Sequence, residues 1–162
     1  MRVRPATPED ADVLRRIYNI EVETSTVTFD LVPRSSEAQL KWMADRSGAH
    51  AVVVASTDDG VVGYGSLSPW RDRPAYSTSV EDSVYVDRDH QGVGVGRALL
   101  GDLVERAQAH GFHAVFARVV AGHDASIGLH ASQGFEVVGH EKEVGRKFGT
   151  WLDVIVMERI LA

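Results

Sequence analysis

The feature that most constrains the fold is the glycine-rich run from Gln91 to Arg97. It follows a stretch with strand character, 83–86, and it opens a stretch with helical periodicity, 97–110. Glycines let the backbone come close to a ligand. The N–H groups of a helix's first turn, at the positive end of the helix dipole, then point at that ligand. A strand, a glycine-rich turn and a helix in this order therefore predict an anion-binding site.

Two familiar phosphate-binding motifs do not match this run. A Walker A loop needs Gly-x-x-x-x-Gly-Lys-Ser/Thr, which the stretch does not contain. A dinucleotide fingerprint needs Gly-x-Gly-x-x-Gly, and counted from Gly92 its last position falls on Arg97. Counted from Gly94 it falls on Leu99, so neither count ends on a glycine. Both nucleotide-binding interpretations are excluded.

Composition excludes several function classes. A length of 162 residues with 44% hydrophobic and 25% charged residues is typical of one globular domain, and we expect 1–162 to form it. The formal charge of −6 argues against a nucleic-acid partner, which would require a basic face. Because the chain has no cysteine, thiolate metal sites and a cysteine nucleophile are excluded, and we expect no bound metal. No apolar run approaches a membrane span and no signal-peptide pattern is present, so we expect a cytoplasmic protein without a membrane partner.

Hydrophobic periodicity predicts the secondary-structure elements. Alternating apolar residues indicate strands, and amphipathic periodicity with capping residues indicates helices. Thr7 followed by Pro8 marks the start of the first helix, and Ser36 with Gln39 three residues later forms a capping box for the second. The stretch 145–151 is predicted to be a loop. The predicted strands are 1–4, 49–56, 61–67, 80–86, 114–120, 135–144 and 152–160, and the later helices are 97–110 and 124–133.

The glycine run resembles Gln/Arg-x-x-Gly-x-Gly/Ala, the pyrophosphate loop of the GNAT superfamily of N-acetyltransferases. Further stretches are similar to one branch of that superfamily, the phosphinothricin and methionine sulfoximine acetyltransferases. These stretches are 70–76, 80–86, 125–130, 133–135 and 145–153. The resemblance implies the GNAT fold, an α/β architecture whose mixed central β-sheet carries helices on both faces. The predicted elements follow its order, β-α-α-β-β-β-α-β-α-β-β.

The same resemblance implies acetyl-CoA as co-substrate and assigns residues to it. In the GNAT fold the strand before the loop splays from its neighbour, which frees main-chain groups at 84–86 for the pantetheine arm. The family's CoA-contacting asparagine is replaced here by His123, and Ser126 is retained. The residues implied to bind acetyl-CoA are Val84, Tyr85, Val86, Gln91, Gly92, Val93, Gly94, Val95, Gly96, Arg97, His123 and Ser126.

Two residues are candidates for catalysis. Acetyl transfer to an amine needs a deprotonated nitrogen, a polarised thioester carbonyl and a proton for the leaving thiolate. Glu81 stands where the family places a carboxylate near the amine, so it is the candidate general base, directly or through water; the alternative is an exposed strand carboxylate. His130 stands where the phosphinothricin branch carries a histidine, so it is the candidate assisting acid or base. Its alternative is a packed histidine with one hydrogen bond.

Cations in two loops are candidates to pair with an anionic substrate group such as an α-carboxylate. For each of them a solvated loop charge is the alternative. Family members often have Tyr-Arg where this chain has Tyr76 and Ser77, so one expected cation is missing. Phe29 and Trp151 are candidates to wall the substrate's side-chain pocket, with a position in the core as the alternative. The predicted substrate-binding residues are Phe29, Arg71, Asp72, Arg73, Glu81 and Lys147.

These residues together predict an acetyl-CoA-dependent N-acetyltransferase acting on the α-amine of a small amino acid or analogue. The resemblance implies phosphinothricin, methionine sulfoximine and methionine sulfone as substrates, and a homodimer. Because there is no nucleophilic cysteine, we expect direct transfer within a ternary complex. Two alternatives stay open: an acetyltransferase for protein N-termini or polyamines, and a CoA-binding regulatory module without catalysis.

Overall fold

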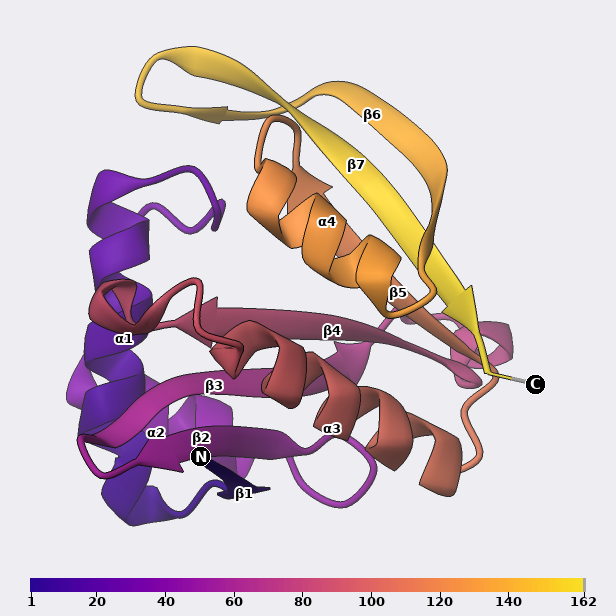
Figure 1. The fold of residues 1–162 in the computed structure, drawn as a ribbon. Helices are drawn as coiled ribbons and strands as arrows, with labels where there is room; N and C mark the ends of the chain where they lie inside the picture. Colours follow the sequence, from indigo (N-terminus) through magenta and orange to yellow (C-terminus); the bar gives the residue numbers. More distant parts are fainter. Residues whose placement is uncertain (162) are drawn as a thin grey trace.

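A seven-stranded β-sheet runs through the centre of the protein (Figure 1). The structure is a computed structural model that describes residues 1–161. The strands are β1 (Arg2–Pro5), β2 (Val52–Thr57), β3 (Gly60–Pro69), β4 (Ser79–Val86), β5 (Ala114–Val120), β6 (Glu136–Lys147) and β7 (Thr150–Ile160). They lie in the order β1-β2-β3-β4-β5-β7-β6, and β4 and β5 are parallel whereas the other neighbours are antiparallel. The predicted mixed sheet is therefore confirmed.

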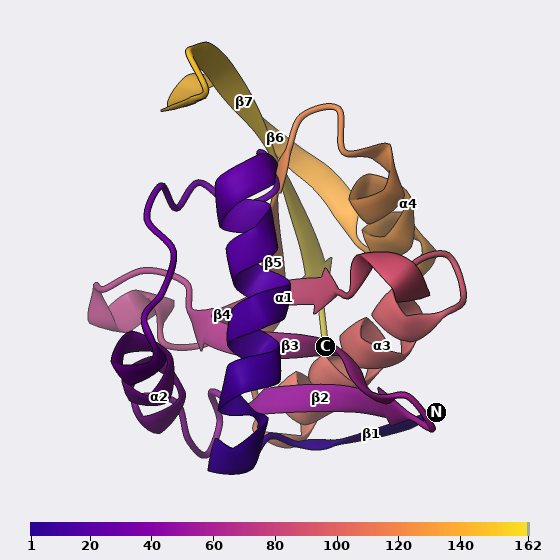
Figure 2. The same ribbon diagram turned by 90° about the vertical axis from the view of Figure 1, so that its left-hand side faces the viewer.

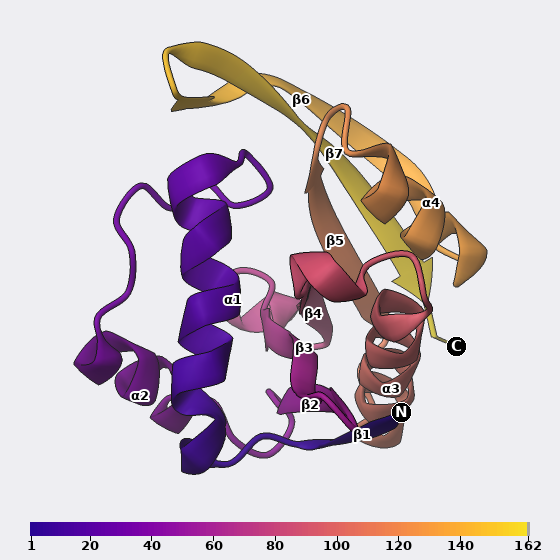
Figure 3. The same cartoon turned by 60° about the vertical axis from the view of Figure 1, so that its left-hand side comes forward.

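Helices cover both faces of this sheet, as predicted. The helices are α1 (Ala11–Thr24), α2 (Ser36–Ala44), α3 (Val95–Ala109) and α4 (Asp124–Ser132), with short 3₁₀ helices η1 (Pro8–Asp10), η2 (Pro74–Tyr76) and η3 (Arg88–His90). Figure 2 and Figure 3 show α1 and α2 on one face and α3 and α4 on the other. Within residues 1–161, no helix combines the length and the apolarity that crossing a membrane requires.

The first helix forms where capping residues and apolar periodicity coincide. Pro8 opens a 3₁₀ turn, and the Thr7 N–H donates to the Asp10 carboxylate at 2.8 Å. Asp10 also pairs with Arg4 at 2.8 Å, which ties the turn to β1. The buried face of α1 then packs on β2 and β3 through Leu14, Ile17, Tyr18 and Val22.

The second helix begins differently from the prediction. Its N-cap is Ser35, whose Oγ accepts a hydrogen bond from the Ala38 N–H at 3.1 Å. The predicted capping box of Ser36 and Gln39 is therefore wrong. Gln39 is 1% exposed and accepts a hydrogen bond from Arg34, which draws its side chain into the protein and away from the helix end.

The main core lies between the sheet and α3, where Leu99 and Leu103 are fully buried. Two glycines in β3 let the helix come close to the sheet. A Cβ added at Gly65 would lie 2.8 Å from Leu103 Cδ1, and one at Gly63 would lie 3.0 Å from Val95 Cγ1. This tight packing fixes α3 against β3 and so positions its N-terminus, which carries the glycine run.

The loop predicted at 145–151 is wrong, because both strands of the last hairpin extend into it. β6 continues to Lys147 and β7 begins at Thr150, so the turn consists of Phe148 and Gly149. Both turn residues have positive φ, +53° and +72°. The hairpin reaches beyond the rest of the sheet, over the end of α1 (Figure 1).

Candidate active site

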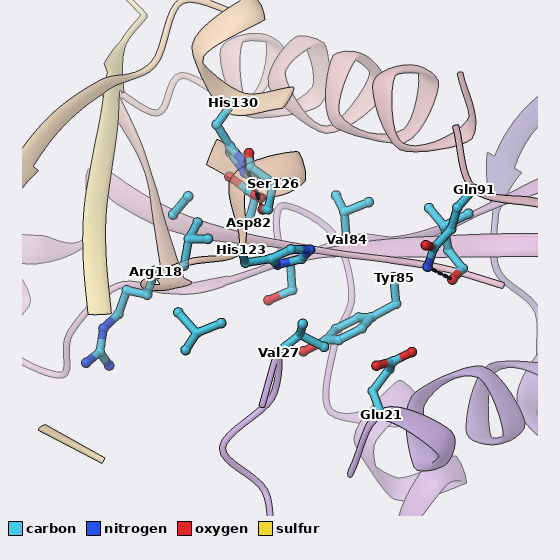
Figure 4. A pocket seen from close by; sticks show the side chains of 15 residues that line it. Glu21, Val27, Asp82, Val84, Tyr85, Gln91, Arg118, His123, Ser126 and His130 are labelled. Carbon is cyan, nitrogen blue, oxygen red and sulfur yellow. Dashed lines mark hydrogen bonds and ion pairs between the residues drawn. The ribbon is translucent and has the colours of Figure 1, made fainter. Parts of the chain in front are cut away.

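β4 and β5 separate partway along their length. Their pairing ends at Glu81 and Phe116, although β4 continues to Val86 and β5 to Val120. The gap between the two strands is lined by both of them and by residues from α1 and α4 (Figure 4). A strand edge of this kind presents main-chain donors and acceptors that an extended ligand can use.

The main-chain groups of Val84 and Val86 point into this gap. On the other side of β4, the Asp87 N–H donates to the Val62 carbonyl of β3 at 2.8 Å. Because main-chain groups alternate in direction along an antiparallel pair, those of Val84 and Val86 face away from β3. The Val86 carbonyl accepts a hydrogen bond from Gln91 Nε2 at 3.3 Å, which fixes the start of the glycine run beside the gap.

Tyr85 contributes to the gap through its side chain. The same alternation directs its main-chain groups toward β3. Its ring packs edge-on against Tyr18 at 5.2 Å and stacks on Tyr64 at 5.4 Å between ring centroids. Burial raises the pKa of Tyr85, and the neighbouring Tyr18 adds to the rise. Tyr85 is thus a neutral aromatic wall at the α1 side of the gap.

The glycine run forms the turn into α3. Gly94 is the N-cap of this helix with φ of +95°, and Gly92 has φ of +74°. Both values lie in the region that favours glycine. A Cβ added at either position would meet no atom within 4 Å, so the outer side of the turn is open. The first N–H groups of α3 border a cavity of about 310 Å³ at this place and make it suitable for an anion.

Of the other members of the run, Val95, Gly96 and Arg97 line that cavity, whereas Val93 does not. Val95 is 3% exposed and belongs to the core, whereas Val93 is 71% exposed. A Cβ at Gly96 would lie 3.2 Å from Leu129 Cδ2, so this glycine allows α3 and α4 to approach each other. Arg97 is exposed on the first turn of α3. The run therefore presents main-chain groups together with the exposed residue Arg97.

His123 and Ser126, at the start of α4, line both the gap and the cavity beside the glycine run. Burial lowers the pKa of His123, although the nearby carboxylate of Glu21 opposes this. The imidazole of His123 is therefore neutral at pH 7. A neutral ring can both donate and accept a hydrogen bond.

Glu21 is a residue of the gap that the sequence did not indicate. It is buried at the end of α1, where Arg88 Nε donates to its Oε1 at 2.8 Å and Ser25 Oγ donates to its Oε2 at 2.6 Å. Burial opposes ionisation, but these partners outweigh it and lower the pKa of Glu21. The ion pair ties α1 to η3, and because its members are 67 positions apart, no local pattern reveals it.

Glu81 is half-buried at the last paired position of β4, between Ser68 of β3 and Phe116 of β5. Burial raises the pKa of Glu81 to about 6, against the opposing charge of Arg118. A carboxylate with such a pKa accepts a proton more readily than an ordinary glutamate and is still ionised at pH 7. The alternative, an exposed strand carboxylate, is wrong, because Glu81 is half-buried.

His130 lies on the other face of the sheet from Glu81. Successive side chains of a strand alternate, so Glu81 and Asp82 point to opposite faces, and α4 covers the face of Asp82. His130 Nε2 lies 2.9 Å from Asp82 Oδ1, and Nδ1 lies 2.8 Å from the main-chain oxygen of Ser126. The ring therefore has two hydrogen-bond partners, not the single one of a simply packed histidine. The sequence did not indicate Asp82 as one of them.

The loop that holds Arg71, Asp72 and Arg73 is exposed but anchored near Glu81. Trp70 stacks on Phe116, the strand neighbour of Glu81, with 4.3 Å between ring centroids. The Arg71 guanidinium lies over the Trp70 ring at 5.0 Å. Asp72 and Arg73 are exposed in the same loop, as a solvated loop charge would be.

Phe29 and Lys147 meet where the last hairpin reaches the loop after α1. Lys147 is 3% exposed and its Nζ donates to the main-chain oxygen of Thr28 at 2.8 Å. Burial lowers the pKa of Lys147, and the charges of Asp30 and Glu21 oppose this. The Phe29 ring packs directly on Gly145 of β6. Lys147 is thus a buried contact of the hairpin, not the solvated loop charge considered as an alternative.

The comparisons with known proteins agree on one family. The sequence matches the family model described as acetyltransferase (GNAT) domain over residues 3–156. It is 39% identical to the L-methionine sulfoximine/L-methionine sulfone acetyltransferase of Pseudomonas aeruginosa, over 96% of this chain and 92% of that protein.

Two solved structures are similar over almost the whole chain. The ribosomal-protein-alanine N-acetyltransferase from Brucella melitensis has a TM-score of 0.97 and 40% identity, covering 99% of this chain and 100% of that one. A GNAT superfamily phosphinothricin acetyltransferase from Sinorhizobium meliloti, in complex with AcCoA, has a TM-score of 0.95 and 36% identity, covering 99% and 88%. The chain therefore belongs to the GNAT family of acetyltransferases, enzymes that use acetyl-CoA as the acetyl donor.

Proposed function

We propose that this enzyme acetylates the α-amine of a small amino acid or analogue. The names of its relatives supply the substrate types, phosphinothricin, methionine sulfoximine and methionine sulfone. The observation that carries the proposal is the position of Glu81 at the start of the gap between β4 and β5. Its half-buried carboxylate has a pKa of about 6. A base of this kind removes a proton from an amine near neutral pH.

Two features of the chain suit acetyl-CoA. The turn at Gly92 and Gly94 leaves open space beside the first N–H groups of α3, which a pyrophosphate can occupy. Along the gap, Val84 and Val86 present main-chain groups that suit the amide-containing pantetheine arm. We propose that His123 and Ser126 complete this binding surface from α4, since both line the gap and the cavity beside the turn.

The mechanism that we propose is direct transfer within a ternary complex. When bound, acetyl-CoA supplies the thioester carbonyl that the amine attacks. Glu81 accepts the amine proton, and the N–H groups on the open edge of β4 hold the carbonyl oxygen. His130 assists from the opposite face of the sheet. The chain has no cysteine, so no thiol of the enzyme carries the acetyl group between the two substrates.

On the amine side we propose that the loop with Arg71, Asp72 and Arg73 and the hairpin tip with Lys147 enclose the substrate, with Phe29 as an apolar wall. The support for Arg71 is its position over Trp70, which stacks beside Glu81. The support for Phe29 is its position between the loop after α1 and β6. A guanidinium held by stacking is suited to a carboxylate of the substrate.

Replacing Gly145 with alanine tests whether the hairpin tip shapes the amine pocket. A Cβ at this position overlaps the Phe29 ring, so the ring or β6 must shift. We expect the KM for the amine to rise about tenfold, as a change of about 1.4 kcal/mol produces, with the KM for acetyl-CoA unchanged. Gly139→Ala in the same strand is the matched control, because its Cβ would make an ordinary contact of 3.7 Å with Val156. Equal effects of the two changes on both KM values would contradict this role.

A protein N-terminus is the second candidate substrate, because the similar structure from Brucella melitensis is named a ribosomal-protein-alanine N-acetyltransferase. Release of the CoA thiol, measured with a panel of amines, separates the candidates. The panel contains free amino acids, the three analogues, a peptide that begins with alanine, and a polyamine. We expect the fastest release with the analogues. Release with the peptide or the polyamine alone would replace the proposal, and acetyl-CoA binding without release would indicate a regulatory module.

We also propose a homodimer. Exposed apolar side chains gather on the β6–β7 hairpin, where a second copy would cover them: Val137, Val138, Val144, Phe148 and Trp151. A monomer in sedimentation at assay concentration would contradict this.

We further propose that residues 1–162 form a single GNAT domain, which limited proteolysis tests. We also propose a cytoplasmic location, which cell fractionation tests.

A further inference from the structure

A buried hydrogen-bonded pair, Asp82 and His130, joins β4 to α4 beside the gap (Figure 4). His130 is 3% and Asp82 5% exposed, and their Nε2 and Oδ1 atoms lie 2.9 Å apart. Both residues line the gap together with Ser126. The Phe135 ring packs edge-on against His130 at 5.0 Å between ring centroids and covers one side of the imidazole. The pair thus lies in the wall of the site and is almost fully buried.

Both ring nitrogens of His130 act as donors in this arrangement. Nδ1 lies 2.8 Å from the main-chain oxygen of Ser126, which can only accept a hydrogen bond. Nε2 lies against a carboxylate oxygen of Asp82, which accepts when it is ionised. While Asp82 is ionised the ring therefore carries both protons and has no lone pair to accept another. In this state His130 is arranged as an acid and not as a base.

The charges around the ring agree with this arrangement. Burial alone would lower the pKa of His130, but the hydrogen bond and the charge of Asp82 outweigh it and raise the pKa. From α4, His123 also faces this region, and its ring is neutral at pH 7. Glu81, the other titratable group of this part of β4, points to the opposite face of the sheet.

The second carboxylate oxygen of Asp82 is unusual. Among the residues that the structure describes, Oδ2 is buried and has no hydrogen-bond partner. Buried polar atoms in native proteins are normally paired, so an atom in this state calls for a donor. Because Asp82 lines the gap, a bound substrate or a water held by it is the natural source of that donor.

We propose that Asp82 is a positioning residue for acetyl transfer, which holds His130 doubly protonated so that His130 is the acid that protonates the leaving CoA thiolate. The inference rests on the proposed function and adds Asp82 to it. Glu81 takes the proton that the neutral amine loses as the carbon–nitrogen bond forms. His130 gives its Nε2 proton to sulfur, through a water in the gap, as the carbon–sulfur bond breaks. Solvent later returns the proton from Glu81 to His130, so the cycle balances.

The direct test is ¹⁵N NMR of the histidine-labelled enzyme without substrates, with His130→Gln to assign the signals. In the natural protein at neutral pH we expect both nitrogens of His130 to be protonated. In the isosteric variant Asp82→Asn we expect Nε2 to lose its proton while Nδ1 keeps the bond to Ser126. Asp58→Asn, in the exposed turn between β2 and β3, should leave the signals unchanged. A singly protonated His130 in the natural protein would overturn the proposal.

The pH profile of kcat is the second test. The natural enzyme should lose activity at high pH as His130 loses its proton. In Asp82→Asn this alkaline loss should begin about one pH unit lower or more, because the neutral side chain no longer stabilises the imidazolium. The KM for acetyl-CoA should change little, since Asp82 acts through His130. If the loss of kcat at high pH occurred at the same pH in Asp82→Asn as in the natural enzyme, Asp82 would not be a positioning residue.

This inference and the proposed function fail in different ways. If no amine produced thiol release, the proposed function would fail, while the NMR signals would still report the state of the pair. If turnover were normal but His130 were singly protonated, only this inference would fail. If Asp82→Asn did not fold, the NMR spectrum of the natural protein would decide the question alone.

Discussion

The enzyme in which Glu81 is replaced by glutamine is expected to turn over about 10²–10⁴-fold more slowly, the usual contribution of a positioned general base. Glutamine keeps the size of the side chain at the last paired position of β4 but cannot accept a proton. The KM for acetyl-CoA should be nearly unchanged, because Glu81 lies on the face of the sheet opposite α3 and its glycine turn. Steady-state kinetics with methionine sulfoximine measures both quantities.

The pH dependence of the natural enzyme should change with this residue. Burial raises the pKa of Glu81 to about 6, so the carboxylate is mostly protonated below that pH and acts as a base above it. In the pH profile of the natural enzyme, kcat should therefore fall as the pH is lowered through about 6. This acid limb of the profile should be absent in Glu81→Gln. Glu105→Gln, an exposed carboxylate on α3, is the control that should leave the limb in place. An unchanged kcat and acid limb in Glu81→Gln would remove Glu81 as the base.

The stability of Glu81→Gln shows whether its loss of activity comes from the missing base or from unfolding. The pKa of Glu81 is raised in the folded state from an ordinary value of 4.5 to about 6. A group of this kind stabilises the folded state below its unfolded pKa, and that contribution is lost as the pH rises through the folded pKa. Above pH 6 the ionised, half-buried carboxylate therefore lowers the free energy of unfolding. Glu81→Gln removes the buried charge, so we expect the variant to be at least as stable at pH 8 as the natural enzyme.

The second large effect is expected at the turn into α3. Gly94 has φ of +95°, and replacing it with alanine strains the backbone by roughly 1–3 kcal/mol. The new methyl group also enters the open space beside the first N–H groups of the helix. We expect the KM for acetyl-CoA to rise at least about tenfold, with a smaller change in the KM for the amine. Substrate-dependence of initial rates measures both constants.

A matched glycine distinguishes the binding role from strain alone. Gly111 ends the turn after α3 with φ of +83°, and a Cβ there would also meet no atom within 4 Å. Gly111→Ala should therefore cost similar stability without changing the KM for acetyl-CoA. If the two variants raised that KM equally, the turn at Gly94 would not be a phosphate site.

The order of strands and helices was predictable because it depends on local patterns. Alternation marked β2 to β5 within a few residues of their ends, and the helix after the glycine run was clear from Leu99, Leu103 and the residues between them. The arrangement of the sheet came from the resemblance to GNAT proteins. The loop predicted at 145–151 failed because its glycines suggested a break, whereas β6 and β7 pair across Gly145–Leu152 and Lys147–Thr150. Long-range pairing outweighed the local signal.

The site could be predicted only in its local parts. The glycine run and Glu81 were recognisable because each lies within one short stretch. The partners that set their chemistry come from distant stretches: Asp82 and His130 are 48 positions apart, and Lys147 and Thr28 are 119 apart. The face that each side chain occupies also depends on the sheet, which is why Glu81 and His130, predicted to act together, lie on opposite faces.

Identification of the product shows whether the enzyme transfers an acetyl group to the α-amine of a small amino acid analogue. The enzyme is incubated with acetyl-CoA and methionine sulfoximine, and the product is analysed by mass spectrometry and NMR. We expect acetylation at the α-nitrogen, in equal amount to the CoA thiol released, with the natural enzyme and far more slowly with Glu81→Gln. Acetylation at another group, or thiol release that does not depend on the amine, would contradict it.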